Sequence, residues 1–218
     1  MKVLVFVDLE ALGEDFIKMC KDILPEWRCN QMMGYKHLRG QVQSAVAWIL
    51  VEKLKDNSER LKDKWVYNEH GKPYFEGRND LFFSISHCKS AVAAVVAEEE
   101  IGIDIEEISR YKESLVKYVL SEEESLELKD DDLEHKAEKF IKIWTQKEAA
   151  FKYYGTGITH DIKDILKRDE VAILSEKIGD DKWLSVATAD KKDKNTVEMT
   201  IVSAEQLYGI IEKWRNFR

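Results

Sequence analysis

Residues 101–106 read Ile-Gly-Ile-Asp-Ile-Glu, and this strict alternation constrains the fold more than any other segment of the 218-residue chain. Successive side chains of a β-strand point to opposite faces of the sheet. The three isoleucines therefore share one face of a predicted strand, while Gly102, Asp104 and Glu106 share the other. The polar face carries two carboxylates two positions apart, so both point the same way.

Two carboxylates placed in this way repel each other unless a cation lies between them or one of them is protonated. A hard divalent cation with oxygen ligands is one solution, and the lack of a side chain at Gly102 leaves room for a ligand to approach the backbone. A strand with one solvated face would show the same pattern. The segment alone leaves both interpretations open.

The rest of the chain is expected to form long ordered elements joined by short turns, because it holds only ten glycines and two prolines. Apolar spacing and turn residues predict helices at 14–24, 36–55, 132–154 and 204–216, and strands at 2–8, 81–87, 91–97, 170–175, 183–189 and 196–202. The short gaps between 81–87, 91–97 and 101–106 indicate an antiparallel meander. Ser121 and Glu124 have the spacing of a capping box.

This order of elements predicts an α+β fold. It divides into two α+β halves, residues 1–100 and 101–218, with a seam near residues 100–107. We expect the active site at that seam, with Asp104 and Glu106 on the first strand beyond it.

Charge and composition narrow the function classes. The chain carries 42 Asp and Glu against 34 Lys and Arg, for a formal net charge of −8. Neither half is basic, so nucleic acid is not an expected partner, and an anionic ligand must be held by local cations or by a metal. No apolar run approaches the ~18–20 residues of a membrane-spanning helix, and the first residues predict a strand rather than a signal peptide.

The cysteines point to a reducing compartment. Cys20, Cys29 and Cys88 are odd in number and lack metal-type spacing, so neither a disulfide framework nor a zinc cluster is expected. We therefore expect a cytoplasmic protein.

A second acidic position lies in the helix expected at 132–154. Phe140, Ile141 and Trp144 fall on one apolar stripe at ~100° per residue, and Glu148 lies inside that stripe. A carboxylate aimed at an apolar interface is costly unless it is paired or bound to a metal. A salt bridge with Lys152, four residues on, is the alternative explanation, because Glu–Lys pairs at this spacing are common on helix surfaces.

A third segment, Phe83-Ser84-Ile85-Ser86-His87-Cys88, is a predicted strand that ends in polar groups. His87 beside the following turn is free to donate to an anion, although a lone histidine is more often structural. Lys72, in the predicted turn Gly71-Lys72-Pro73, would ordinarily be a surface lysine. Cys88 is not expected to be a nucleophile paired with His87, because adjacent strand residues point to opposite faces.

The four segments together are more specific than any one of them. Their order is Gly-Lys-Pro at 71–73, Phe-Ser-x-Ser-His at 83–87, Ile-Gly-Ile-Asp-Ile-Glu at 101–106 and Trp-Thr-x-Lys-Glu-Ala-x-x-Lys at 144–152. This order resembles the 4′-phosphopantetheinyl transferase superfamily, and the length resembles its larger, pseudo-dimeric class, the type that activates surfactin synthetase. The resemblance covers residues 70–157 strongly and residues 25–55 weakly.

The resemblance implies a fold of two similar α/β halves in one monomeric chain. It also implies a reaction in which the 4′-phosphopantetheine arm of coenzyme A moves to a serine of an apo acyl or peptidyl carrier protein, which becomes the holo form. The other product is adenosine 3′,5′-bisphosphate. Carrier proteins of this kind serve fatty-acid, polyketide and nonribosomal peptide synthesis.

The resemblance also implies roles for individual residues. Asp104, Glu106 and Glu148 would hold Mg²⁺, for which Mn²⁺ could substitute, while Glu148, Lys152 and Asp104 would be catalytic. The residues implied to contact coenzyme A are Lys72, Pro73, Ser86, His87, Lys152, Lys36 and Arg39, with Arg28 as a rival to the last two. The residues implied to dock the carrier are Val116, Val119 and Leu120, with Tyr118 in the same apolar patch. A helix packed on its own core would explain these residues equally well.

Two other functions use the same residues. One is a different metal-dependent enzyme, such as a phosphodiesterase or pyrophosphatase, which would not need Lys72 and His87 to hold an adenine nucleotide. The other is a non-catalytic protein that binds coenzyme A or a carrier. Against it stands the presence of all four residues, since a degenerate relative would be expected to lose one of Asp104, Glu106, Glu148 and Lys152.

Overall fold

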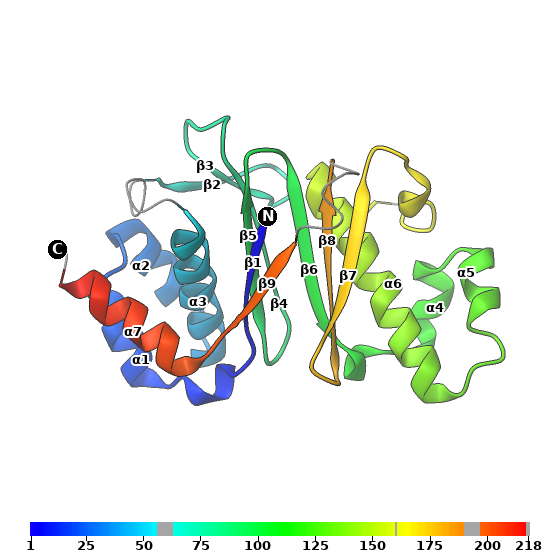
Figure 1. The fold of residues 1–218 in the computed structure, drawn as a ribbon, viewed down its shortest axis with the longest axis horizontal. Helices are drawn as coiled ribbons and strands as arrows, with labels where there is room; N and C mark the ends of the chain where they lie inside the picture. Colours follow the sequence, from blue (N-terminus) through cyan, green and yellow to red (C-terminus); the bar gives the residue numbers. More distant parts are fainter. Residues whose placement is uncertain (56–62, 160, 190–196, 217–218) are drawn as a thin grey trace.

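Two β-sheets face each other between two groups of helices (Figure 1). The computed structural model describes residues 1–55, 63–159, 161–189 and 197–216. The α+β class predicted from the sequence is confirmed. None of the described helices combines the length and the apolar character that a membrane crossing requires.

The first sheet has the strand order β4-β5-β1-β9. Its strands are β4 (Phe82–His87), β5 (Val92–Ala97), β1 (Lys2–Phe6) and β9 (Glu198–Val202). The neighbours β4 and β5 are antiparallel, as are β5 and β1, whereas β1 and β9 are parallel. The apolar strand expected at 91–97 is thus central, as predicted.

One helical group covers the outer face of this sheet (Figure 1). Its members are α1 (Glu14–Lys21), α2 (Glu26–Met33), α3 (Leu38–Leu54) and α7 (Ala204–Arg215). A short 3-10 helix, η1 (Leu9–Ala11), follows β1. A separate hairpin of β2 (Trp65–Tyr67) and β3 (Pro73–Phe75) packs its Trp65 and Phe75 into the same core.

The second sheet has the order β6-β8-β7, with all neighbours antiparallel. Its strands are β6 (Ile101–Glu107), β8 (Lys182–Thr188) and β7 (Ala172–Ile178). The long helix α6 (Leu133–Tyr154) lies across its outer face, with α4 (Glu113–Val119) and α5 (Glu122–Glu127) beyond (Figure 1). The 3-10 helices η2 (Ile108–Arg110) and η3 (Ile165–Lys167) complete this side.

Strand β6 buries the face that the alternation at 101–106 predicts. Ile101, Ile103 and Ile105 are buried in a core between the two sheets, together with Val3 and Val95 of the first sheet. The polar face of β6 is therefore turned toward α6. The capping box is also present, because Ser121 accepts a hydrogen bond from the backbone of Glu124 and the Glu124 carboxylate accepts one from the backbone of Ser121.

The predicted meander is wrong at its third strand. β6 does not continue the sheet of β5 but pairs with β8, with Asp104 opposite Ser185. Packing face to face buries the isoleucines of β6 against the first sheet, and hydrogen bonding edge to edge with β5 would not. Periodicity reports the buried face of a strand but not its hydrogen-bonded neighbour.

The predicted division at residue 100 also needs correction at the C-terminal end. β9 pairs in parallel with β1, and Leu207, Ile211 and Trp214 of α7 are buried with the helices of the first group. Residues 198–215 therefore lie with the first half, not the second. The strand and helix expected there do form.

Candidate active site

Helix α6 rests directly on the polar face of β6, and Gly102 is the point of closest approach. A Cβ atom at Gly102 would lie 2.0 Å from the carbonyl oxygen of Ala149 and 2.5 Å from the backbone nitrogen of Tyr153. The sequence-based expectation that a ligand approaches the backbone at Gly102 is thus wrong, because α6 occupies that space. This contact brings Glu148 and Lys152 of the helix over Asp104 and its strand.

Buried hydroxyl groups fix α6 on the same sheet. The Thr145 hydroxyl lies 2.8 Å from that of Ser185, and both side chains are fully buried. The Ser185 hydroxyl lies 2.9 Å from that of Ser175 on β7, which accepts a hydrogen bond from Gln146 at 3.0 Å. Because Ser185 is paired with Asp104 across the strands, this row of polar groups also sets the register of α6 over Asp104.

Three elements meet at Asp104, whose side chain is almost entirely buried. Its Oδ1 atom accepts a hydrogen bond of 2.7 Å from the Ser86 hydroxyl of β4 and one of 2.7 Å from the Lys152 ammonium of α6. Lys152 also donates to the Ser86 oxygen at 2.9 Å. The structure thus brings together three predicted site residues from β4, β6 and α6.

Glu148 and Glu106 lie within electrostatic reach of Asp104. Burial raises the pKa of Glu148 to about 7, with the negative charge of Asp104 adding to the shift and the ammonium of Lys152 opposing it. Burial also raises the pKa of Glu106, and the charge of Asp104 adds to that shift. The three carboxylates thus share one environment in which negative charge is in excess.

The raised pKa of Glu148 has a consequence for stability. A carboxyl with a folded-state pKa above its ordinary value of 4.5 stabilises the fold fully below that value, and this contribution is lost as the pH rises toward about 7. We expect the free energy of unfolding of the metal-free protein, relative to Glu148→Gln, to fall by about 3 kcal/mol across this range. Urea denaturation at a series of pH values measures the difference, and parallel curves for the two proteins would contradict it.

The donor set at Asp104, Glu106 and Glu148 suits a hard divalent cation. Among the residues that the structure describes, no three His, Cys, Asp or Glu side chains are gathered into a group that could hold a metal ion. Asp104 faces Lys152, and Glu106 accepts a hydrogen bond from the Glu107 backbone at 2.9 Å and lies 3.4 Å from Arg110. Three oxygen-only ligands with excess negative charge fit Mg²⁺. The metal site stays a prediction that needs these side chains to turn.

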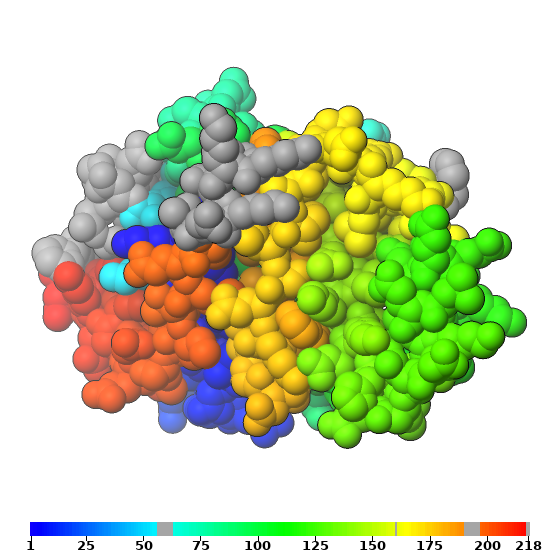
Figure 2. All heavy atoms as spheres, turned by 45° about the vertical axis from the view of Figure 1, so that its right-hand side comes forward, coloured from blue at the N-terminus to red at the C-terminus, as the bar shows by residue number. Residues whose placement is uncertain are grey.

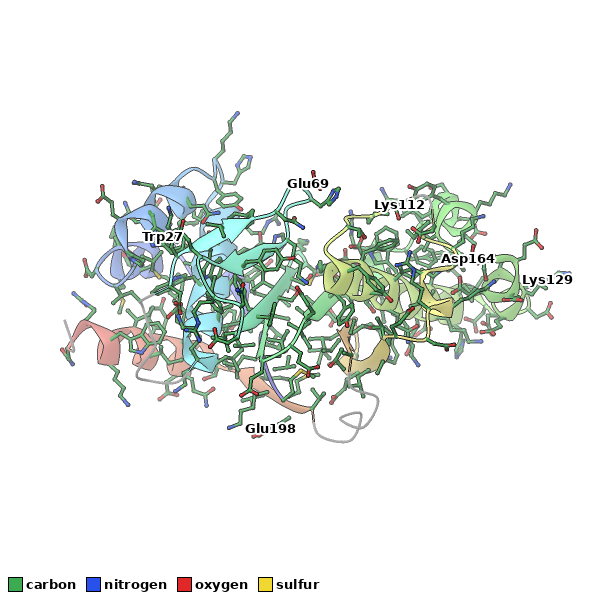
Figure 3. The ribbon with its side chains drawn as sticks, turned by 90° about the horizontal axis from the view of Figure 1, so that it is seen from above. Trp27, Glu69, Lys112, Lys129, Asp164 and Glu198 are labelled. Carbon is green, nitrogen blue, oxygen red and sulfur yellow. The ribbon has the colours of Figure 1, made fainter. Side chains whose placement is uncertain are left out.

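A pocket of about 270 Å³ opens beside Glu148 and takes its walls from β4, the β2–β3 hairpin, α6 and the residues just after α6. The hairpin turn between β2 and β3 contributes Lys72 and Pro73, and α6 contributes Glu148 and Lys152. Figure 3, seen from above, places Glu69 in this turn between the two helical groups. Residues of three of the four segments therefore line one cavity, and Asp104 of the fourth is joined to it through its hydrogen bond with Lys152.

Lys72 is in the pocket wall, but its ammonium is already engaged. The side chain is 5% exposed, and Nζ forms an ion pair with Glu100 and donates to the carbonyl oxygen of Tyr153 at 2.7 Å. His87, in contrast, ends β4 as an exposed residue. Partial burial of its ring and the nearby charge of Lys152 lower the pKa of His87.

The three cations predicted in the first half differ in exposure. Lys36 and Arg39 are exposed around the first turn of α3, and Gln43 of that helix donates to the carbonyl of Cys88 at 2.7 Å, so this end of α3 lies beside the end of β4. Arg28 is 3% exposed and donates to the carbonyl of Ser44 at 2.5 Å. Arg28 is therefore a structural residue and not an available phosphate ligand.

The predicted docking patch is wrong for Val119 and Leu120. Val119 and Leu120 are buried in a core with Phe140 and other side chains of α6, and Val116 packs against that core. In Figure 2, α4 and α5 form the green projection at the right of the molecule. The exposed aromatic residue of α4 is Tyr118, at 59% exposure. The apolar spacing of this short helix is thus used for its own packing, which the sequence left as the alternative.

Lys147 is a buried structural residue of the second helical group that the sequence pattern did not predict. It is fully buried, and its ammonium donates to the Glu124 carboxylate at 2.6 Å and to the carbonyl of Val119 at 2.8 Å. It thereby ties α6 to α4 and α5. The signals were its position next to Glu148 and the capping box that fixes Glu124, but neither pattern reveals burial.

Comparison with known proteins agrees with the motif order. Residues 100–199 match the family model of the 4′-phosphopantetheinyl transferase superfamily. The chain is 33% identical over 112 residues to the 4′-phosphopantetheinyl transferase AcpT of Salmonella typhi, over 50% of this chain and 58% of that protein. It is 31% identical over 158 residues to the 4′-phosphopantetheinyl transferase Sfp of Bacillus subtilis (strain 168), over 71% of this chain and 70% of that protein.

A third relative matches over a smaller share of both chains. The 4′-phosphopantetheinyl transferase gsp of Aneurinibacillus migulanus is 32% identical over 91 residues, which are 42% of this chain and 38% of that protein. The chain thus spans 58% of the length of this AcpT, 38% of gsp and 70% of Sfp.

Proposed function

This chain belongs to the 4′-phosphopantetheinyl transferase superfamily, and we propose that it transfers the 4′-phosphopantetheine arm of coenzyme A to a serine of an apo acyl or peptidyl carrier protein. One observation carries the proposal. Asp104, Glu148 and Lys152, from a strand and a helix that lie far apart in the sequence, meet beside a pocket that the β2–β3 hairpin also lines.

The reaction breaks the phosphoanhydride bond of coenzyme A and forms a phosphodiester bond to the carrier serine. The carrier serine oxygen bonds to the phosphorus that bears the pantetheine arm, and the bond from that phosphorus to the oxygen of the adenosine 5′-phosphate breaks. The serine proton must be removed, and the departing adenosine 3′,5′-bisphosphate gains negative charge. The chain therefore needs a base on one side of the phosphorus and a cation on the other.

Glu148 suits the role of the base. In the metal-free site burial raises the pKa of Glu148 to about 7, which makes its carboxylate a better proton acceptor than an ordinary one. It takes the serine proton directly or through an oriented water. Lys152 suits the role of the cation, because its ammonium is held at 2.7 Å from Asp104 and borders the pocket. It stabilises the leaving phosphate.

Asp104, Glu106 and Glu148 are the residues that would hold Mg²⁺, with Mn²⁺ as a substitute. The ion would neutralise the pyrophosphate of coenzyme A and draw charge from the phosphorus under attack. We assign contact with the phosphates to Ser86 and His87 at the end of β4, and contact with the 3′-phosphate to Lys36 and Arg39, which are exposed around the start of α3.

We also propose that the protein works as a cytoplasmic monomer. A single chain supplies both walls of the pocket, and its three cysteines are free, as in a reducing compartment. Size-exclusion chromatography at micromolar concentration tests the monomer.

Replacing Lys152 by alanine separates its catalytic role from binding. We expect turnover to fall by about 100-fold, because the cation acts on charge that develops during the reaction. The KM for coenzyme A should rise by no more than about threefold, since the phosphates keep other contacts. Steady-state kinetics gives both values. Lys129→Ala, at an exposed lysine at the far end of the second helical group (Figure 3), is the control that should leave both unchanged. A large rise in KM with normal turnover would refute the assignment.

The product balance tests the function itself. We expect adenosine 3′,5′-bisphosphate to be released from coenzyme A and Mg²⁺ only when an apo carrier is added, and chromatography measures it. Release without a carrier would identify a phosphodiesterase or pyrophosphatase. Binding of coenzyme A without release by any carrier would identify a non-catalytic protein.

A further inference from the structure

The turn between β2 and β3 is bonded to the last turn of α6, which belongs to the other helical group. The last carbonyl groups of a helix have no partner inside the helix. Here the carbonyl of Tyr153 accepts a hydrogen bond of 2.7 Å from the Lys72 ammonium, and the carbonyl of Gly155 accepts one of 2.8 Å from the Asn68 amide. Two orphan carbonyl groups of α6 are thus satisfied from outside the helix.

Asn68 also shapes the turn that carries Lys72. Its Oδ1 atom accepts hydrogen bonds from the backbone of Lys72 at 2.8 Å and of His70 at 3.0 Å. Gly155 ends α6 in the left-handed conformation, at φ 68°. A Cβ atom there would lie 2.9 Å from Cδ of Lys72 and 3.3 Å from Nδ2 of Asn68, so the turn packs closely on the helix end.

Lys72 has a second partner on a third element. Its ammonium forms an ion pair with Glu100, the residue directly before β6. With only 5% of the side chain exposed, the cation needs both acceptors, because burial lowers its pKa and Glu100 opposes that shift. Lys72 thus joins the hairpin, the start of β6 and the end of α6.

The position of this helix end bears on the site. Lys152 directly precedes Tyr153, and its ammonium reaches Asp104 and Ser86 at 2.7 and 2.9 Å. A shift of the last turn of α6 would move Lys152 away from both. We propose that Lys72, with Asn68 and Glu100, is a latch that fixes the end of α6 and so positions Lys152, and that Lys72 is not a ligand of the coenzyme A phosphates. For its effect on turnover this rests on the proposed transferase function.

Lys72→Met tests the latch, because methionine keeps the apolar stem and removes the ammonium. We expect amide hydrogen exchange in residues 151–157 to accelerate by about tenfold, since the helix end loses a tie to the hairpin. The Kd for coenzyme A, measured by calorimetry, should change by less than about threefold, and turnover should fall by about tenfold through the misplaced Lys152.

The opposite pattern overturns the proposal. Unchanged exchange at 151–157 together with a Kd for coenzyme A at least about tenfold weaker would make Lys72 a phosphate ligand. Lys64→Met, at an exposed lysine just before β2, is the matched control and should behave as wild type. If Lys72→Met fails to fold, Glu100→Gln decides: it should accelerate the same amides without weakening coenzyme A binding, and no acceleration would overturn the latch.

The readouts separate this proposal from the proposed function. Hydrogen exchange and coenzyme A binding need neither a carrier nor turnover. A chain without transferase activity in which Lys72→Met still loosens residues 151–157 keeps the latch and loses the function. A working transferase in which these amides do not change keeps the function and loses the latch.

Discussion

Asp104→Asn is expected to lower phosphopantetheine transfer by about 1000-fold or more while leaving the protein folded. The substitution keeps the size of the side chain but removes the charge that binds Lys152 and that is predicted to ligate Mg²⁺. It also removes the negative charge that helps raise the pKa of Glu148, so that pKa should fall below about 7. Transfer assays measure the activity, and carbon-13 NMR titration of Glu148 measures the pKa.

Stability should change by less than about 2 kcal/mol, because Lys152 keeps a carboxylate neighbour in Glu148 and one source of like-charge repulsion is removed. Glu99→Gln is the matched control, since it removes one acidic charge from an exposed turn close in sequence to β6. Transfer by Asp104→Asn within about tenfold of wild type would show that this carboxylate is not part of the machinery.

Gly102→Ala is expected to damage both the fold and the activity, although it adds a single methyl group. The new Cβ would lie 2.0 Å from a backbone oxygen and 2.5 Å from a backbone nitrogen of α6, and neither atom can move without the helix. We expect a loss of about 1–3 kcal/mol in the free energy of unfolding. Because α6 carries Glu148 and Lys152, its displacement should also lower turnover by about 100-fold. Urea denaturation and transfer assays give the two values.

Gly209→Ala is the matched control for this change. Gly209 lies in α7, and a Cβ there meets nothing within 4 Å. This variant should be unchanged or more stable by up to about 1 kcal/mol, because alanine is the better helix former. Normal stability and turnover in Gly102→Ala would mean that α6 does not have to sit at this distance from β6.

Local patterns of the sequence predicted much of the fold. The alternation of Ile101, Ile103 and Ile105 with polar residues correctly predicted which face of β6 is buried, and Ser121 correctly marked a helix start. These features depend on residues that are near neighbours in the chain, so spacing alone reports them.

Contacts between distant segments could not be predicted in this way. Nothing in the spacing of β6 shows that it pairs with β8, and nothing in residues 198–202 shows a parallel pairing with β1. Val119 and Leu120 have the apolar character of a docking patch and of a core residue alike, and only the position of α6 decides between them.

The candidate site shows the same difference between local patterns and contacts of distant segments. Its acidic residues stand out because a buried or clustered carboxylate is costly, and that cost is visible in the sequence as a break in an apolar pattern. The partners of Lys72 are not visible, because Glu100 and Tyr153 follow it by 28 and 81 residues. A lysine in a turn has the same appearance whether it meets a phosphate or the end of a helix.

Intact-mass spectrometry of the carrier tests the central claim most directly. The purified chain is incubated with coenzyme A, Mg²⁺ and an apo carrier protein, with carriers from fatty-acid, polyketide and peptide synthesis tried in turn. At least one carrier should gain the mass of a single phosphopantetheine group on its serine, and the gain should disappear with Asp104→Asn. Unchanged masses for all of the carriers, with a folded enzyme that binds coenzyme A, would contradict the proposed function.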